Sequence, residues 1–448
     1  MQALIILTLC TATLMDFAAE SKAVPGLLRF TPEMLSVIIV GLVFFKALRG
    51  GLSIVPNKYW FAFGFLAFVI VCGIFANSVD VGPLLAGMRY YLRAIPLFFL
   101  PAVANFSPKQ IQQQVKVVLA IAFIQVPIAI FQRYTVMAEG RMSGDDVRGT
   151  VADSGVLSII LICVVVILTA YCMRGYLRRL PFLLMFFILL IPTTINETKA
   201  TVVFLPLGLM ATLIAASAPG KRIKVAIGGV ALLAAFAAIL IPVFTAMNAQ
   251  GNSAERRESL VDFFGNEQRL NGYINDKKDV GLGTRRLVGR GTAIAFPLRY
   301  LSQDPLHLAF GLGIGNASHS SLGENFTGKY YELFQYFVVS AAAVFLIELG
   351  MIGTLLVVVL YWLVFTDAIA VMKADTEKTG AIAAGWVGVV AVMGIAEFYN
   401  VTHGFASLSY LYWYFAGIVV ARRGQLILQQ SVAAAPRPAP QRIPIGSR

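Results

Sequence analysis

Charge is scarce in this sequence. Asp, Glu, Lys and Arg make up 13% of the 448 residues, and 58% of the residues are hydrophobic. An ordinary soluble domain carries about 25% charged residues, so this chain has too few polar side chains to cover a globular surface. A soluble enzyme and a disordered chain are therefore both disfavoured. The mean hydropathy of +0.77 indicates a membrane protein instead.

Cysteine and histidine are also rare. The four cysteines all lie within apolar runs, at Cys10, Cys72, Cys163 and Cys172. We interpret them as small hydrophobic residues without metal-site spacing, and a disulfide-stapled secreted domain is excluded. We therefore expect no metal and no cofactor. The candidates for imidazole chemistry are limited to His307, His319 and His403.

Long apolar runs are what the sequence has in abundance. A helix that crosses a bilayer needs about 20 apolar residues, and about twelve stretches approach that length. The predicted spans are 2–18, 31–48, 59–77, 83–104, 111–132, 153–173, 180–195, 199–217, 224–246, 349–371, 379–398 and 404–421. The first lacks a basic leading region, so we interpret it as a span and not as a signal peptide. The predicted fold class is an all-α polytopic membrane protein.

The positive charges predict an orientation. Lys and Arg in alternate short loops favour one side by about 14 to 6, which places both termini in the cytoplasm. The net charge of +13 is then mainly a topology signal, and it implies no nucleic-acid partner. Residues 422–448, with the run AAAPRPAP, are predicted to form a disordered cytoplasmic tail.

One connection is much longer than the others. From Met247 to Gln335 it holds ten basic and nine acidic residues, 19 of the chain's 59 charges. Long loops without structure of their own are uncommon, and helix-like stretches occur at Ser253–Phe264 and Gly291–Leu301. We expect a small folded extracytoplasmic cap. The predicted domains are 1–246 with nine spans, 247–348 as the outer loop, 349–421 with three spans, and the tail.

Two arginines interrupt the fourth predicted span, GMRYYLRAIPLFFLP. Arg89 and Arg93 are four residues apart, so they share one face of a helix near its outer end. Two guanidiniums on one face form a fork suited to a phosphate or a pyrophosphate. The alternatives are that they extend to the lipid headgroups or pair with Asp80 or Glu197.

Two further loops on the same predicted side carry polar residues. In PTTINETKATVVFLP, Lys199 could contact a substrate phosphate and Glu197 could pair with an arginine; a hydrated Glu–Lys pair is the alternative. The loop before the sixth span has acidic residues of the kind that bind divalent cations. These acidic residues are Asp145, Asp146 and Asp153, and Arg148 lies among them. Their spacing matches no EF-hand, and nearby glycines indicate a turn.

The long loop contains arginines followed by the glycine-rich sequence GLGIGNAS. The arginines are Arg285, Arg286, Arg290 and Arg299. The glycines do not follow a strand, so a dinucleotide site is excluded, although their backbone N–H groups could approach an anion. His319 lies in a polar stretch with Glu324, where an imidazole could act as a general base; a solvated surface histidine is the alternative.

The apolar stretch YFVVSAAAVFLIELGMIG follows the long loop. It is too apolar for a free loop, so we expect a re-entrant or interfacial helix whose Glu348 faces the protein interior. Near the outer end of the next-to-last span, Glu397, Asn400 and His403 form another polar group. We interpret these three as interfacial residues that end the span.

The combined pattern resembles the O-antigen polymerase and ligase family, including exopolysaccharide repeat-unit polymerases. The resemblance covers the arrangement of about twelve spans with one large outer loop and the sequences GMRYYLRAIPLF, GDDVRGT, GRG, GLGIGN and IELGMIG. It implies a C-type glycosyltransferase-like fold in a bacterial inner membrane. It also implies a metal-independent transfer of glycan from a polyprenyl-diphosphate carrier at the periplasmic face.

The resemblance also implies roles for particular residues. Arg89 and Arg290, with Arg93, Arg286 and Lys199 nearby, would hold the diphosphate, while Glu197 and Glu348 would belong to a polar network. The expected partners are a polyprenyl-diphosphate-linked oligosaccharide, the lipid bilayer, a chain-length regulator and a flippase.

The sequence departs from the family at one point. Ligases commonly carry a histidine shortly before the acidic position, where this chain has Val338, Val339 and Ser340. His319 or Glu324 would then supply the base. We expect a polymerase, with a ligase acting on lipid A-core, or a transporter of the same lipid-linked sugar, as the alternatives.

Overall fold

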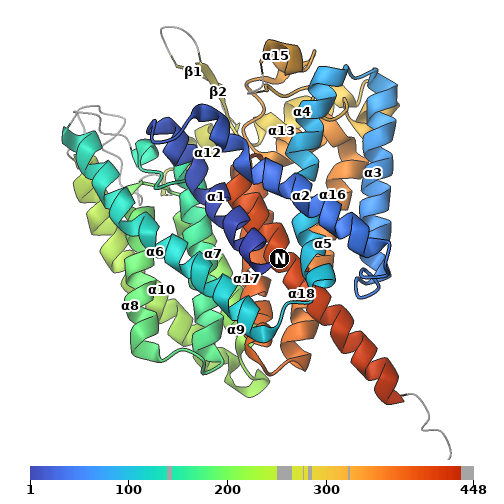
Figure 1. The fold of residues 1–448 in the computed structure, drawn as a ribbon. Helices are drawn as coiled ribbons and strands as arrows, with labels where there is room; N and C mark the ends of the chain where they lie inside the picture. The colour runs from blue at the N-terminus through green and yellow to red at the C-terminus, as the bar shows by residue number, and fades with distance from the viewer. Residues whose placement is uncertain (139–143, 250–264, 276, 281–284, 321–322, 435–448) are drawn as a thin grey trace, which may run out of the picture.

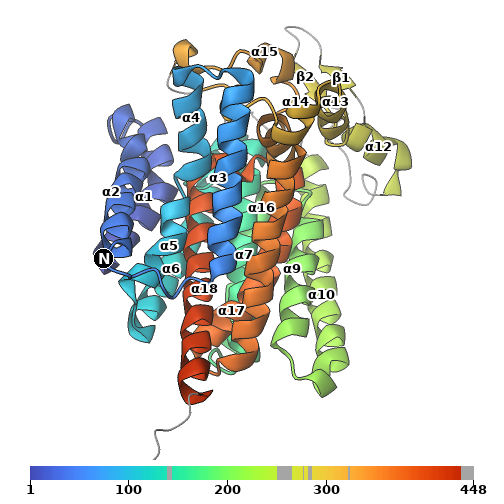
Figure 2. The same ribbon diagram turned by 90° about the vertical axis from the view of Figure 1, so that its right-hand side faces the viewer.

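The computed structural model describes residues 1–138, 144–249, 265–275, 277–280, 285–320 and 323–434. The chain forms a helical bundle with a small cap at one end (Figures 1 and 2). The bundle helices are α1 (Gln2–Glu20), α2 (Thr31–Ala47), α3 (Asn57–Asn77), α4 (Val81–Leu92), α5 (Ile95–Ala104), α6 (Pro108–Ala138), α7 (Ser154–Met173), α8 (Arg179–Ile195), α9 (Thr201–Ala216), α10 (Arg222–Ala249), α16 (Ala341–Ala374), α17 (Lys378–Tyr399) and α18 (Ala406–Ala434).

The cap contains short elements from the long connection. They are α12 (Glu267–Asn275), the antiparallel hairpin β1 (Lys277–Val280) and β2 (Arg285–Val288), α13 (Thr292–Leu301), α14 (Pro305–Phe310) and α15 (Tyr331–Phe334). The helix expected over Gly291–Leu301 is α13. The one expected over Ser253–Phe264 lies outside the described residues. We call the end that carries these elements the cap end, and the opposite end, where α18 finishes, the tail end.

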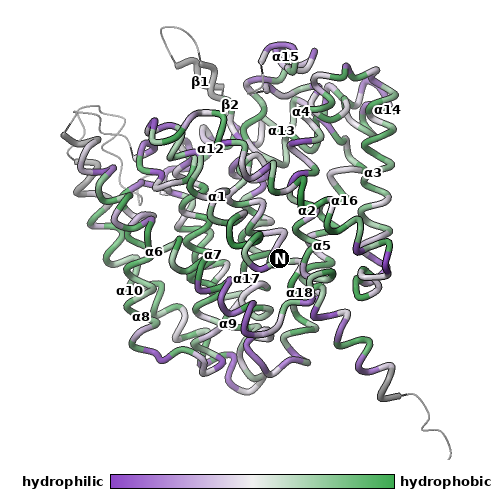
Figure 3. The backbone as a smooth tube through the Cα atoms, viewed as in Figure 1, coloured by the Kyte–Doolittle hydropathy of each residue, from purple (hydrophilic) through white to green (hydrophobic). Residues whose placement is uncertain are grey.

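Hydrophobic residues occupy the middle of the bundle, and hydrophilic residues gather at its two ends (Figure 3). Among the described residues, eight helices are long and apolar enough to cross a membrane: α1, α2, α3, α6, α7, α10, α16 and α17. The helices α5, α8 and α9 are apolar but shorter. These features are those of an all-α membrane protein, and helices occupy each of the twelve predicted ranges.

The core lies around α7 and α17, which are the most buried of the long helices, while α10 and α2 are the least buried. Small residues allow the central helices to approach closely. A Cβ added to Gly388 of α17 would lie 2.1 Å from the Thr212 hydroxyl oxygen and 2.4 Å from the Gly208 carbonyl oxygen on α9. Any larger side chain at Gly388 would therefore separate α17 from α9.

The fourth predicted span is not one helix. It consists of α4 and α5, which are separated at Arg93 and Ala94. Pro96 lies in the first turn of α5, where its missing N–H removes a backbone hydrogen bond from a continuous helix. The break turns the backbone immediately after Arg93.

The segment predicted to be a re-entrant or interfacial helix contains the first arm of α16. Gly350 has φ 67° and ψ −169° inside this helix, which is therefore kinked into Ala341–Leu349 and the segment that follows. The predicted domain boundary at residue 348 thus falls within α16. Glycine is required at the kink because φ is positive, and because an added Cβ would lie 2.4 Å from the Gly311 nitrogen.

Candidate functional site

A cavity of about 320 Å³ lies between α4 and the cap-end loops. Its lining brings together Arg89, Arg93, His319 and Glu348, which were all singled out from the sequence. α4 and the residue that follows it supply the arginines, the glycine-rich loop supplies His319, and the first arm of α16 supplies Glu348. The cavity therefore combines residues from three distant parts of the chain.

A second polar cavity, of about 260 Å³, lies against α1 and α2. Its acidic lining residues are Asp16, Glu20 and Glu33, and its basic ones are Arg29, Arg89 and Arg93. Arg89 of α4 and Arg93, the residue after α4, line both cavities, as does Gly404. The arginine pair is thus accessible to a ligand from either side.

The two arginines converge on a single carboxylate oxygen. Arg89 Nη2 lies 3.0 Å and Arg93 Nη1 lies 3.1 Å from Glu33 Oε1. The Arg93 Nη2 atom also donates to the carbonyl oxygens of His403 at 3.2 Å and Gly404 at 2.7 Å. Two backbone carbonyls and one shared carboxylate therefore fix the direction of Arg93, whose side chain is 8% exposed.

The buried polar atoms of this cluster include Glu33 Oε2 and Arg93 Nε, neither of which has a hydrogen-bond partner within the described part of the chain. A buried polar atom without a partner costs about 1–3 kcal/mol. Such atoms occur at sites that a ligand or water completes.

The glycine-rich loop does bring backbone N–H groups to an anion, but that anion is the chain's own Glu348. The N–H of Gly315 donates to Glu348 Oε2 at 3.0 Å, and the N–H of Ala317 donates to Oε1 at 3.3 Å. The Ser318 hydroxyl donates to Oε1 at 2.7 Å. Glu348 is 2% exposed, so its carboxylate holds the loop on the kinked helix and does not present a free charge to the cavity.

The same loop completes the first arm of α16. The N–H groups of Leu312 and Gly313 donate to the carbonyls of Ile347 and Glu348 at 2.8 and 3.1 Å. These carbonyls precede the kink and would otherwise lack helical partners. The Asn77 amide of α3 donates to the Gly311 carbonyl at 3.0 Å. The cavity wall is therefore anchored to both α3 and α16.

The two predicted bases differ in position. His319 is exposed, lines the first cavity and lies 5.3 Å, ring to ring, from Tyr331. Glu324 is also exposed, but it lies in a separate turn, Glu324–Phe326, and does not line that cavity. The geometry thus favours His319 over Glu324 as the group that reaches a ligand there.

Glu397 and His403, which the sequence suggested to be interfacial, form a buried polar network. His403 Nδ1 lies 2.9 Å from Glu397 Oε1. The hydroxyls of Tyr361 and Thr402 donate to the two oxygens of the same carboxylate. Because Arg93 donates to the His403 and Gly404 carbonyls, this network supports the segment that orients Arg93.

Arg290 belongs to another cluster at the cap end. Its Nε donates to the Tyr399 carbonyl at 3.4 Å, and its guanidinium carbon lies 5.2 Å from the Tyr273 ring centroid and 5.8 Å from that of Tyr399. Partial burial raises the pKa of the Tyr273 phenol, while Arg290 acts to lower it. Arg290 does not line the cavity that holds Arg89.

The other predicted residues also lie apart from the arginine pair. Glu197 Oε1 forms an ion pair with Arg133 Nη1 at 2.9 Å. Lys199 precedes α9 and is part of the same turn. Arg286 lies on β2, opposite Asp279 in the strand register.

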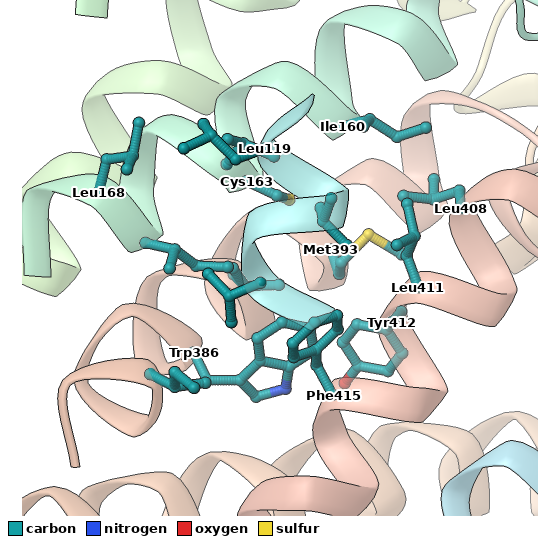
Figure 4. A pocket seen from close by; sticks show the side chains of 16 residues that line it. Leu119, Ile160, Cys163, Leu168, Trp386, Met393, Leu408, Leu411, Tyr412 and Phe415 are labelled. Atoms are coloured by element: carbon teal, nitrogen blue, oxygen red, sulfur yellow. The ribbon is translucent and has the colours of Figure 1, made fainter. Parts of the chain in front are cut away.

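A third cavity, about 60 Å³ in volume, is apolar and lies between α6, α7, α17 and α18 (Figure 4). Trp386, Met393, Leu408 and Phe415 contribute to its wall. A small cavity lined by such side chains offers no groups for acid–base or phosphate chemistry. The two arginine-lined cavities do contain such groups, and we take them as the candidate functional site.

Glu33 is the site residue that sequence reasoning missed. It is the only acidic residue between Glu20 and Asp80, and it stands in the first turn of the largely apolar α2. A lone acid at such a position, together with two arginines that need a counter-charge, was the available signal.

The described residues contain no group of three His, Cys, Asp or Glu side chains that could hold a metal ion. Asp145 and Asp146 lie exposed in a short turn, Gly144–Asp146. In comparisons with known proteins, no family model matches this chain, and no curated protein matches it.

Proposed function

We propose that the protein is a membrane glycosyltransferase that polymerises oligosaccharide repeat units carried on a polyprenyl diphosphate. In this proposal the chain crosses a bacterial inner membrane about twelve times, with both termini in the cytoplasm and the cap in the periplasm. The observation that carries the proposal is the pair Arg89 and Arg93 bordering two polar cavities at the cap end.

The chemistry needs few protein groups. The acceptor hydroxyl oxygen forms a bond to the anomeric carbon, and the bond from that carbon to the diphosphate oxygen breaks. Negative charge then increases on the leaving diphosphate, where positioned guanidiniums stabilise it. Arg89 and Arg93 supply this stabilisation. Removing one such donor from an enzyme typically lowers turnover by about 10²–10³-fold.

The hydroxyl proton also requires an acceptor. His319 lies at the mouth of the arginine-lined cavity, within its lining and exposed to solvent. It is the base in this proposal. Glu348 is excluded from that role because both of its oxygens accept hydrogen bonds from the glycine-rich loop.

The test uses strains in which the gene is replaced by single variants. We expect Arg89→Gln and Arg93→Gln to abolish long-chain polysaccharide at a normal protein level, as read from gels of chain length and from immunoblots. The matched control is Arg299→Gln, an exposed cap arginine that lines neither cavity. It should leave chain length unchanged.

Full-length polysaccharide in both the Arg89 and Arg93 variants would refute the proposal. A deletion strain that accumulates long but unattached polymer would instead indicate the ligase. Accumulation of single repeat units on the cytoplasmic leaflet would indicate a transporter.

A further inference from the structure

We propose that Glu33 competes with the substrate for Arg89 and Arg93. Its carboxylate occupies the place between the two arginines that a phosphate of the donor takes. This inference rests on the proposed function, because it concerns the same diphosphate site. It adds a residue that controls which anions enter. Both arginines are then paired with Glu33 in the protein without substrate.

The contact geometry supports exchange. Both arginines donate to the same oxygen of Glu33, at 3.0 and 3.1 Å. A phosphate offers several strong acceptor oxygens to paired guanidiniums. Arg93 Nη2 donates to the His403 and Gly404 carbonyls, but Arg93 Nε is buried without a partner in the described chain. The shared carboxylate oxygen therefore does not satisfy every donor of Arg93.

Other buried carboxylates in the molecule are satisfied differently. Glu348 accepts three hydrogen bonds through its two oxygens, and Glu397 accepts hydroxyl donors on both. Asp367 and Asp375 also accept a donor on each oxygen. Glu33 differs because Oε2 is buried without a partner among the described residues. Glu33 therefore has one oxygen without a hydrogen-bond partner, whereas both oxygens of these other carboxylates have one.

The turn that precedes Glu33 is exposed, while the helix that carries it is packed. Glu33 lies in the first turn of α2, which follows the short turn Gly26–Phe30, and no residue of that turn is buried. The neighbouring residues Pro32, Leu35 and Ser36 are buried, so the backbone of α2 is fixed by packing. Glu33 itself lines the second cavity, so its side chain can change rotamer there without moving the helix.

Such a competitor discriminates by charge. A phospholipid phosphodiester carries one negative charge, as Glu33 does, so exchanging one for the other yields no additional attraction. A polyprenyl-linked diphosphate carries more negative charge and more acceptor oxygens, and it gains from both arginines at once. Glu33 would thus keep abundant lipid headgroups out of the site and admit the diphosphate.

The experiment is a calorimetric titration of the purified full-length protein in detergent with inorganic pyrophosphate. We expect Glu33→Gln to bind pyrophosphate about tenfold more tightly than the wild type, which corresponds to about 1.4 kcal/mol. The matched control is Glu20→Gln. Glu20 lines the same cavity but pairs with Arg148 at 2.6 Å, so its removal should change the affinity by less than about twofold.

Two further variants complete the test. Glu33→Asp keeps the charge but shortens the side chain, so it should bind pyrophosphate with an affinity between those of wild type and Glu33→Gln. If the glutamine variant does not fold, Glu33→Asp replaces it in the comparison with the wild type. Arg93→Gln in the wild-type background should weaken binding, which reports on the arginine site itself.

The outcomes separate the two proposals. If the wild type binds pyrophosphate through Arg93 but Glu33→Gln binds it equally or more weakly, the competitor role is overturned and the diphosphate site stands. An equal gain in Glu20→Gln would also overturn it, because the effect would be general charge. If neither wild type nor the Glu33 variants bind pyrophosphate, both proposals fail.

Discussion

The acidic side chains Glu33 and Asp367 lie at opposite ends of the bundle, and each faces two cations. At the tail end, Lys58 Nζ lies 2.6 Å from Asp367 Oδ1 and Arg423 Nε lies 3.8 Å away, while the Tyr59 hydroxyl donates to Oδ2 at 2.9 Å. At the cap end, Arg89 and Arg93 share one oxygen of Glu33, and the other oxygen has no partner in the described chain.

This difference separates structural from functional charge. Asp367 ties the start of α3 to α16 and α18 through a set of donors that uses both oxygens. Such a carboxylate contributes to the fold, because removing it leaves the buried Tyr59 hydroxyl unpaired. In the cluster around Glu33, by contrast, buried polar atoms remain without hydrogen-bond partners, and its arginines line two cavities. We therefore expect changes at the tail end to alter stability and changes at the cap-end arginines to alter activity.

The largest effect is expected at Glu348. Glu348→Ala leaves the N–H groups of Gly315 and Ala317 and the Ser318 hydroxyl without their acceptor, which should lower the free energy of unfolding by about 3–5 kcal/mol. Unfolding in mixed micelles with increasing SDS measures this. Glu348→Gln, which keeps the shape, should lose less, and wild-type stability in the alanine variant would show that the loop is held by other contacts.

Arg93→Gln comes next, and it should act on catalysis. We expect turnover per folded molecule to fall about 10²–10³-fold, as measured with a lipid-linked donor. Because the His403 and Gly404 carbonyls also lose a donor, stability should fall too, but by less than in Glu348→Ala. Arg423→Gln is the control, since it removes an arginine near Asp367 at the tail end. If both arginine variants lost activity equally, the distinction between the two ends would be wrong.

A moderate effect on stability alone is expected for Asp367→Asn. The amide keeps the shape of the side chain but removes the charge that faces Lys58 and Arg423, so the free energy of unfolding should fall by about 1–3 kcal/mol. Turnover per folded molecule should remain at the wild-type value. A loss of turnover beyond the loss of folded protein would contradict a purely structural role.

The smallest effect on stability is expected for Glu33→Gln. Because one oxygen lacks a partner and the side chain is 16% exposed, we expect the free energy of unfolding to change by less than about 1 kcal/mol. The same SDS titration measures it. A loss as large as that of Asp367→Asn would make Glu33 a structural residue of the same kind.

Much of the helical architecture could be predicted from local pattern. Apolar length alone locates the helices, and the spacing of four residues places Arg89 and Arg93 on one face. The break after Arg93 could also have been predicted, because Pro96 follows it closely. The spans could be anticipated because each depends on residues that are near one another in the chain.

The partners of the charges could not be predicted in this way. Glu33 is 56 and 60 residues from the arginines that it contacts, and Glu348 is more than 30 residues from the loop amides that bind it. Such pairs are set by how the helices pack and not by local periodicity. The sequence suggested an anion near the glycine-rich loop, but it did not indicate that Glu348 is that anion.

The most direct test of the account is a reaction of the purified protein in detergent with a radiolabelled polyprenyl-diphosphate-linked oligosaccharide. We predict chain elongation without a membrane, lost in Arg93→Gln and retained in Asp367→Asn. Elongation that persists at the wild-type rate in Arg93→Gln, or no elongation by the wild type, would contradict the assignment of the arginine-lined cavities as the site of glycan transfer.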